Sequence, residues 1–303
     1  MEKRYLIGVD VGTTGTKALL FSEDGALLGQ AYQDYPILTP QVGHSEQNAG
    51  DWWNAVVTVI RSVCDGKDIG ERVAAISLST QGGTVVPVGQ DGEPLRPALV
   101  WNDARCEAQK EAFLKEVGPE RVMYEKTGWK LGCGLPALEI RWLRENEPAL
   151  FEKTALFLTV PDYISLKMTG IPAVDPSNAG INQLIDIQTL RYDEKLLRFA
   201  GITEKQLPKL VRSGERIGHL TKEAAETLGL SEKAVLISGA HDQYAVAMGA
   251  GAMKKGDILI GSGTCWVVTA MGDAPDFESG LSQSVSAAPE LWGSMWSLST
   301  GGV

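Results

Sequence analysis

The chain has 303 residues, 44% hydrophobic and 22% charged, which is the composition of an ordinary globular protein and excludes a disordered or collagen-like chain. Its formal net charge is −10, from 28 basic and 38 acidic residues. An acidic protein lacks the positive surface that attracts nucleic acid or anionic membranes at long range. An anionic ligand would therefore have to be held locally, by backbone amides or a metal ion.

The cysteines and the apolar segments indicate a cytoplasmic protein. The cysteines are far apart in the sequence and include no C-x-x-C pair, so neither a disulfide framework nor a structural zinc site is expected. They are Cys64, Cys106, Cys133 and Cys265. The first apolar run is too short for a signal peptide and is interrupted by Asp10, and no window has the length of a membrane span.

Short apolar runs alternate with helical patterns along the chain, which is typical of an α/β fold. In chain order the expected elements are strands at 5–9, 17–21 and 26–32, a helix capped by Asn48, a strand at 73–79, helices at about 104–116 and 137–144 (the latter stopped by Pro148), a strand at 235–238, a helix at about 243–250, and a strand, turn and strand within 256–270. The first three strands would form a meander.

The turn between the first two strands carries the sharpest chemical signal. Asp10 ends a buried strand and is followed by residues 11–16 (VGTTGT) and Lys17. Glycines allow positive φ and close approach of backbone N–H groups to a phosphate, while threonine and lysine side chains add donors. A buried carboxylate also needs a partner such as hydrated magnesium. A purely structural hairpin explains these residues equally well.

A second strand–turn–strand unit, with GSGT at 261–264, repeats this pattern late in the chain. The repetition suggests duplicated domains that face each other, and the alternative is coincidence between two common turns.

Asp242 follows the apolar strand at 235–238 and precedes a helix of small residues. Acids at the carboxyl ends of strands in α/β sheets commonly face the ligand crevice. Asp242 could therefore accept a proton from a hydroxyl that attacks a phosphoryl group. A helix cap is the competing interpretation. His241 is expected to be a neighbour with satisfied polar atoms, because no fixed spacing supports a His-based mechanism.

Together and in order, these segments resemble the FGGY family of carbohydrate kinases, which belong to the actin-like ATPase superfamily. The resemblance extends from Tyr5 to at least Ala270. Its blocks are IGVDVGTT at 7–14, SEQ at 45–47 with WW at 52–53, LRPA at 95–98, VWNDARC at 100–106, PDY at 161–163, LKMTG at 166–170, DPSNAG at 175–180, DQ at 242–243 and GSGT at 261–264. The LRPA and VWNDARC blocks are most similar to the xylulokinase form.

The resemblance implies an actin-like ATPase (ribonuclease H-like) α/β domain followed by the beginning of a second domain of the same fold. Residues 1–253 would be the N-terminal sugar-binding and catalytic domain, and residues 254–303 the incomplete start of the C-terminal nucleotide-binding domain. Because family members continue further, the chain is expected to be truncated and to transfer phosphate poorly or not at all by itself.

The resemblance also implies in-line transfer of the γ-phosphoryl group of ATP to a sugar hydroxyl in the presence of Mg²⁺. Asp242 would be the catalytic base and Asp10 the metal ligand. The residues that contact ATP would be Asp10, Gly12, Thr13, Thr14, Lys17, Gly263 and Thr264. The residues that contact the sugar would be Gln81, Gly82, Gly83, Asp242 and Gln243. A homodimer is also considered.

The identity of the sugar is indicated by mixed signals. Glycerol kinases have Gln-Arg-Glu-Thr where this chain has QGGT at 81–84. The Arg and Glu side chains that contact glycerol in those enzymes are therefore absent, and glycerol is disfavoured as the substrate. Xylulokinases have Met-His-Gly after that Gln and an Asn after the catalytic Asp, where this chain has Gln243. The VWNDARC block favours a ketopentose such as xylulose or ribulose, and another sugar or polyol stays open. A tight turn that needs positive φ explains Gly82 and Gly83 equally well.

Two other classes of protein share parts of the pattern. Actin-like and chaperone ATPases have paired phosphate hairpins but lack the ordered sugar-kinase blocks. A non-catalytic sugar-binding relative would keep the fold, but the presence of Asp10, Asp242 and both turns argues against degeneration.

Overall fold

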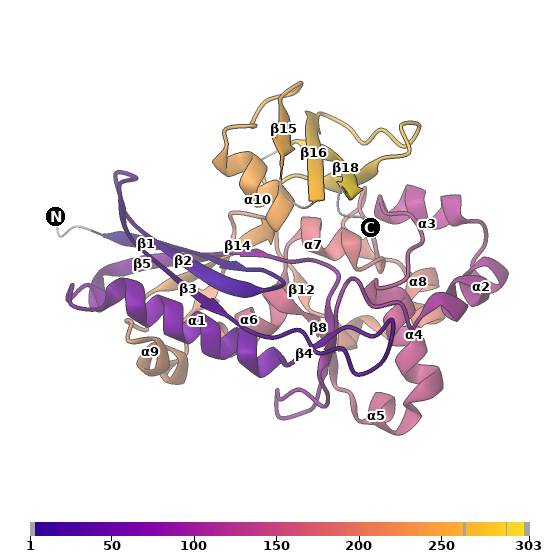
Figure 1. Ribbon diagram of the computed structural model, residues 1–303, viewed down its shortest axis with the longest axis horizontal. Helices are drawn as coiled ribbons and strands as arrows, with labels where there is room; N and C mark the ends of the chain where they lie inside the picture. The colour runs from indigo at the N-terminus through magenta and orange to yellow at the C-terminus, as the bar shows by residue number, and fades with distance from the viewer. Residues whose placement is uncertain (1–3, 263–264, 289, 300–303) are drawn as a thin grey trace.

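The computed structural model describes residues 4–262, 265–288 and 290–299, and its centre is a six-stranded sheet (Figure 1). The strands, in sheet order, are β13 (Arg216–His219), β14 (Val235–His241), β5 (Val73–Thr80), β1 (Tyr5–Val11), β2 (Gly15–Ser22) and β3 (Leu27–Asp34). The strands β1, β2 and β3 form the predicted antiparallel meander, and β5 and β14 run parallel to β1. The α/β prediction is confirmed.

One face of this sheet is buried against helices. The helix α1 (Ala49–Cys64) contacts β2 and β3, and α6 (Val160–Thr169) and α9 (Lys222–Leu228) pack beside it (Figure 1). Side chains of a strand alternate between the two faces of a sheet, so Ile7 and Val9 enter this core while Gly8 and Asp10 point to the opposite face. The opposite face is the one that can hold a ligand.

A second core lies beside the main sheet, around a four-stranded sheet and several helices. The strands of that sheet are β4 (Glu46–Gln47), β7 (Ala98–Leu99), β6 (Val85–Val88) and β8 (Leu156–Thr159). The neighbouring elements are α2 (Glu107–Glu116), α3 (Glu120–Thr127), α4 (Pro136–Asn146), α5 (Pro148–Lys153), α7 (Pro176–Ile181), α8 (Glu194–Ala200), the 3₁₀ turns Gly70–Arg72 and Glu204–Gln206, and the short strand pairs β9 (Ala173–Val174) with β12 (Lys209–Leu210) and β10 (Ile185–Asp186) with β11 (Arg191–Tyr192).

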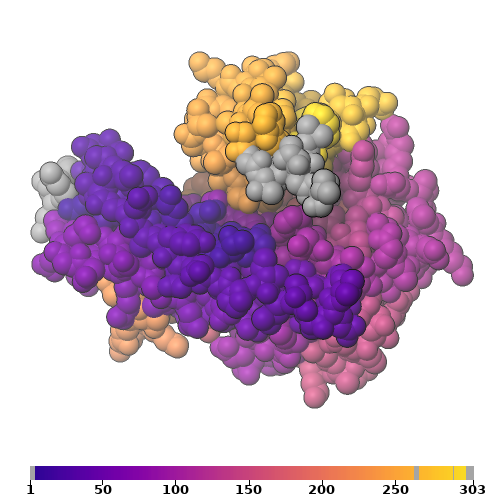
Figure 2. Space-filling model, in the orientation of Figure 1, coloured from indigo at the N-terminus to yellow at the C-terminus, as the bar shows by residue number. Residues whose placement is uncertain are grey.

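The last part of the chain forms another sheet above the open face of the main one (Figure 1). Its strands are β15 (Ile258–Gly261), β16 (Cys265–Gly272), β18 (Trp292–Ser299) and β17 (Ser282–Val285). The helix α10 (Asp242–Gly249) contacts β14, β5 and β16 and so joins the two sheets. The two strands predicted within 256–270 are confirmed as the antiparallel pair β15–β16, and residues 263–264 of the predicted turn lie outside the described residues. Figure 2 shows a hollow between the indigo N-terminal strands and the orange region that contains α10 and β15.

Two helix ends differ from the prediction for identifiable reasons. The helix predicted from about residue 104 begins at Glu107, because the Asp103 carboxylate accepts hydrogen bonds from the N–H groups of Ser45 and Arg105 and holds the preceding segment in a turn. Pro148 does follow the end of α4, but it also begins α5, where a proline at the first position costs no hydrogen bond. Asn48 precedes α1 as predicted, although its side chain donates to Asp51 rather than capping the helix.

Glu139 in α4 is a fully buried carboxyl group, and among the described residues neither of its oxygens has a hydrogen-bond partner. Burial, followed by the negative charge of Asp103, raises its pKa well above the usual value. A raised folded-state pKa contributes stability at low pH that is lost as the pH rises through it. Glu139→Gln should therefore raise the melting temperature by about 3–6 °C near pH 8 and flatten its dependence on pH.

Thermal melts between about pH 5 and about pH 9 would test this prediction. The exposed Glu152→Gln, in the adjacent helix α5, is the matched control and should keep the wild-type slope. Equal slopes for wild type and Glu139→Gln would contradict the assignment.

Candidate active site

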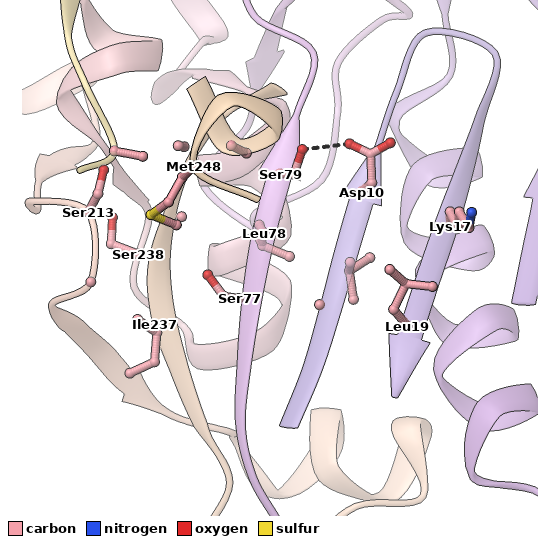
Figure 3. Close-up of a pocket in the computed structure, with 17 residues that line it drawn as sticks. Asp10, Lys17, Leu19, Ser77, Leu78, Ser79, Ser213, Ile237, Ser238 and Met248 are labelled. Atoms are coloured by element: carbon pink, nitrogen blue, oxygen red, sulfur yellow. Dashed lines mark hydrogen bonds between the residues drawn. The ribbon is translucent and has the colours of Figure 1, made fainter. Parts of the chain in front are cut away.

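A cavity of about 560 Å³ lies on the open face of the main sheet, beneath α10 (Figure 3). Its floor consists of residues that alternate with the core positions, including Gly8 and Asp10 of β1, Lys17 of β2 and Ser79 of β5. Met248 of α10 reaches over the opposite side. The volume is that of a small-molecule site.

Asp10 lies in the middle of a row of residues that are register partners across β2, β1 and β5. Lys17 is its neighbour on one side and Ser79 on the other. The Ser79 hydroxyl donates to Asp10 Oδ1 at 2.6 Å (Figure 3). Burial raises the pKa of Asp10, the Asp242 charge adds to this, and the Ser79 hydrogen bond and Lys17 oppose it. The Asp10 side chain is exposed to water in the cavity, but the surrounding protein still removes part of the water that would stabilise its charge.

Replacing Asp10 with asparagine should stabilise the ligand-free protein, because a carboxylate with a raised folded-state pKa lowers stability once it is ionised. The expected increase in melting temperature at neutral pH is about 2–4 °C, and it should vanish at a pH low enough to protonate the carboxyl group. Scanning calorimetry of both proteins at the two pH values checks this. A lower melting temperature for Asp10→Asn at neutral pH would contradict it.

The first turn requires glycine at position 15 because of close packing, and the positive φ that was also predicted for its glycines is not found. Neither Gly12 nor Gly15 has a positive φ among the residues described. A Cβ at Gly15 would lie 2.4 Å from Tyr32 Oη and 2.7 Å from the Gln33 carbonyl oxygen. The turn is thus packed tightly against β3, and only glycine fits there.

Two side chains from other segments, Gln81 and Trp101, hold this turn in place. Gln81 is buried, and its amide donates to Gly12 O at 3.3 Å and accepts from Thr13 Oγ1 at 3.1 Å. Trp101 Nε1 donates to the same Thr13 hydroxyl at 3.1 Å. The hydroxyl of Thr13 is therefore already engaged within the protein. In the described part of the chain, the backbone N–H groups of Thr13 and Thr14 have no hydrogen-bond acceptor, so they are the donors left for an anion.

Asp242 is the first residue of α10, and His241 precedes it as the N-cap position. Among the described residues, Asp242 Oδ1 is buried and accepts no hydrogen bond, so the helix-cap interpretation is wrong. Its nearest ionisable partner is His241 Nε2, 3.4 Å away. Gln243 follows in the first turn of α10 and is half-buried. The structure thus brings Asp242 close enough to Asp10 for its charge to raise the pKa of that carboxyl group.

His241 and Trp129 each have a buried polar atom that lacks a hydrogen-bond partner among the described residues, which the sequence did not predict. His241 was expected to be satisfied, but within the described residues its buried Nδ1 has no partner. Trp129 Nε1 is likewise buried without a partner, and its ring stands edge-on to the His241 ring with 6.3 Å between centroids. Buried polar atoms without partners carry a desolvation penalty that a polar ligand can relieve. No sequence motif marks Trp129, whereas the adjacency of His241 to Asp242 is a usable signal.

The two glycines after Gln81 are needed for different reasons. Gly83 has a φ of +73°, as the tight-turn interpretation requires. Gly82 lacks a positive φ, but a Cβ there would lie 2.7 Å from His241 Cδ2 and 3.0 Å from Ile181 Cγ2. The missing side chain at position 82 therefore makes room for the His241 ring, and both glycines are buried.

The end of β14 is held by a buried polar network. Asp175 accepts hydrogen bonds from the Ser177 hydroxyl and from Asn178 Nδ2, the latter at 2.6 Å. Ser177 Oγ in turn accepts the backbone N–H of His241 at 2.9 Å. This network gives the DPSNAG block a physical role, because it fixes the backbone immediately before Asp242.

The donor set suits a divalent cation that keeps part of its water. Asp10, Asp242 and Ser79 offer only oxygen atoms, which Mg²⁺ prefers, and Mg²⁺ is commonly held by one or two carboxylates plus phosphates and water. No cluster of three or more metal-binding side chains exists among the described residues, so a complete protein cage is absent from that part of the chain. The predicted phosphate contacts Gly263 and Thr264 lie outside the described residues.

Comparison with known proteins identifies the class of protein to which the chain is similar. The family model described as the N-terminal domain of the FGGY family of carbohydrate kinases matches residues 5–249. The chain is 30% identical to the gluconokinase of Bacillus subtilis over 272 residues, which cover 89% of this chain and 52% of the relative. It is 31% identical to the xylulose kinase of the same organism over 266 residues, or 88% and 53% of the two chains.

Solved structures agree with these matches. The crystal structure of xylulose kinase from Rhodospirillum rubrum superimposes with a TM-score of 0.94 at 26% identity, covering 98% of this chain and 61% of that one. The predicted actin-like ATPase fold is thereby confirmed. The chain spans about half the length of the curated relatives it matches. Within the described residues, no helix is long and apolar enough to cross a membrane.

Proposed function

The chain belongs to the FGGY family of carbohydrate kinases, and on this premise we propose that it carries the sugar site and the catalytic base of an ATP-dependent sugar kinase. Residues 1–253 would form the sugar-binding and catalytic domain, and residues 254–303 would begin the nucleotide-binding domain. The observation that carries the proposal is the buried Oδ1 of Asp242, which accepts no hydrogen bond among the described residues and belongs to a carboxylate whose charge raises the pKa of Asp10.

In the proposed reaction, Asp242 accepts the proton of the sugar hydroxyl while the oxygen of that hydroxyl attacks the γ-phosphorus of ATP and ADP leaves. Because no donor within the described residues forms a hydrogen bond to Asp242 Oδ1, this oxygen can receive the hydrogen bond of the sugar hydroxyl that precedes the transfer. The Asp175–Ser177 network keeps the backbone of His241 in place, so that Asp242 is oriented before the sugar arrives.

The ATP phosphates would lie near the backbone N–H groups of Thr13 and Thr14, which have no acceptor among the described residues, and Lys17 on the cavity floor would add a positive charge. Asp10 would hold Mg²⁺, which would neutralise charge on the phosphates. The engaged amide of Gln81 would position Thr13 rather than contact the sugar directly. Gly263 and Thr264 would add phosphate contacts from the opposite domain.

The sugar would bind between Trp129, His241 and the Gly82–Gly83 turn. Trp129 Nε1 can donate to a sugar oxygen, and His241 Nδ1 can donate or accept according to its tautomer. Gln243, half-buried beside Asp242, would complete the contacts. The flat face of Trp129 would also pack on the C–H groups of the sugar.

We favour a ketopentose such as xylulose or ribulose. Trp129 and Tyr244 contact the ring of His241, the residue before Asp242, and neither of these two side chains carries a positive charge. Gluconate, which the gluconokinase relative makes the second candidate, has a carboxylate that an Arg or Lys would normally pair. A neutral sugar fits this lining better than an anionic one.

A coupled ATP-consumption screen with xylulose, ribulose, gluconate and glycerol tests the function. It is run on the 303-residue chain and on the longest gene product that contains it, and calorimetry on the 303-residue chain measures sugar binding in parallel. The expected result is ATP turnover that depends on a ketopentose, with weak or no turnover on glycerol. ATP turnover that is equal with and without every sugar would identify an ATPase instead. Sugar binding without transfer by the longest gene product would identify a non-catalytic binding relative, whereas weak or absent transfer by the 303-residue chain alone is expected.

A further inference from the structure

The fold brings together two cysteines that are far apart in the sequence. Cys106 Sγ lies 3.0 Å from Cys133 Sγ, where the segment before α2 meets the turn before α4. Cys106 is fully buried and Cys133 is half-buried. The absence of a C-x-x-C motif is therefore misleading here, because tertiary packing rather than spacing pairs these thiols.

We propose that Cys106 and Cys133 form a reversible dithiol–disulfide pair that reacts with low-molecular-weight disulfides. A protein disulfide has an S–S distance of about 2.05 Å, so closing the bridge requires a movement of only about 1 Å. The surrounding backbone is already close, because the Gly134 N–H donates to Cys106 Sγ at 3.2 Å. This inference does not depend on the proposed kinase activity.

The two thiols are unequal, which assigns each a role in the exchange. The hydrogen bond from Cys106 lowers the pKa of Cys133, and Cys133 is also the thiol that solvent can reach. The hydrogen bond to Cys133, together with burial, raises the pKa of Cys106. Cys133 is thus the attacking thiolate, and Cys106 is the resolving thiol.

The exchange is balanced as follows. The Cys133 thiolate attacks one sulfur of the small disulfide, whose S–S bond breaks, and the first small thiolate leaves and takes up the proton that Cys133 released. The Cys106 thiol then attacks Cys133 Sγ in the mixed disulfide and expels the second small thiolate, which takes the Cys106 proton. Two protein thiols are oxidised to one disulfide, and one small disulfide is reduced to two thiols.

The pair lies next to the segment of Trp101, which contacts the first turn. A Cβ on Gly134 would lie 2.2 Å from the Trp101 carbonyl oxygen, so the turn that carries Cys133 is pressed against the segment that carries Trp101. Trp101 also donates to Thr13 in the first turn. The disulfide would covalently tie these two segments together beside the sugar and phosphate turns.

The test is peptide mapping of the wild-type protein after incubation with excess glutathione disulfide, acid quenching and alkylation. Trypsin should release residues 106–110 (CEAQK) and 131–141 (LGCGLPALEIR) as one linked peptide that dithiothreitol separates. Both thiols should become inaccessible to the alkylating reagent, and Cys64→Ser should behave like wild type.

Cys106→Ser should stop the reaction at the mixed disulfide on Cys133, and Cys133→Ser should leave Cys106 alkylatable once the protein is denatured. The proposal is overturned if the wild type keeps both thiols free, if it accumulates only the mixed disulfide, or if Cys133 is linked to Cys64 or Cys265 instead. Because the main measurement uses the wild-type chain, failure of a variant to fold would not obscure the result.

Discussion

Asp242→Asn, made in the longest gene product that contains the chain, is expected to lower the rate of ATP-dependent sugar phosphorylation by about 10³-fold, a typical loss when a general base is removed. The amide keeps the size of the carboxylate but cannot accept the sugar proton. Sugar affinity should change by less than about threefold, because the amide oxygen can still accept the hydroxyl hydrogen bond. Rates from the coupled assay and affinities from calorimetry separate the two effects.

The matched control is Asp273→Asn, which makes the same chemical change in an exposed ion pair with Lys255. It should retain the wild-type rate. A rate for Asp242→Asn within about tenfold of wild type would remove Asp242 from the role of base.

Gly239→Ala should strongly destabilise the main sheet. A Cβ at Gly239 would lie 1.6 Å from the Leu78 carbonyl oxygen and 2.6 Å from the Leu78 carbonyl carbon. Both atoms belong to the backbone of β5, the strand that pairs with β14. The clash therefore cannot be relieved by rotating a side chain. We expect a loss of about 3 kcal/mol or more and a melting temperature lowered by about 10 °C.

Gly8→Ala is the control, because Gly8 lines the same cavity but a Cβ there meets no atom within 4 Å. Its melting temperature should stay within about 3 °C of wild type. Equal stability of the two variants would show that β5 and β14 are not held as closely as described. Gly239→Ala should also weaken sugar binding, because β14 leads directly into Asp242.

Five of the six strands of the main sheet were predictable from the sequence, because they are short runs whose alternation of apolar residues indicates the buried face, whereas β13 was not predicted. The first meander, β5 and β14 all appear where those runs occur. The start of α2 was not predictable, because it depends on the Asp103 carboxylate binding the N–H of Ser45, a contact between distant segments.

The two acids of the site were found from their positions at the ends of strands, but their surroundings were not. Trp129 comes from a loop with no motif and meets His241 only in the folded chain. The role of Gly82 is also tertiary, since the space that it leaves is filled by a ring from position 241. The pairing of Cys106 with Cys133 has the same origin.

A crystal structure of the protein with a ketopentose and Mg²⁺–ADP would test the central claim most directly, namely that Asp10 and Asp242 serve one phosphoryl-transfer site. The account predicts a sugar hydroxyl about 2.6–3.2 Å from an Asp242 carboxylate oxygen. It also predicts Mg²⁺ about 2.1 Å from Asp10, or one water molecule away, with the sugar against Trp129 and His241. A sugar bound away from Asp242, or a metal–nucleotide complex that does not contact Asp10, would contradict it.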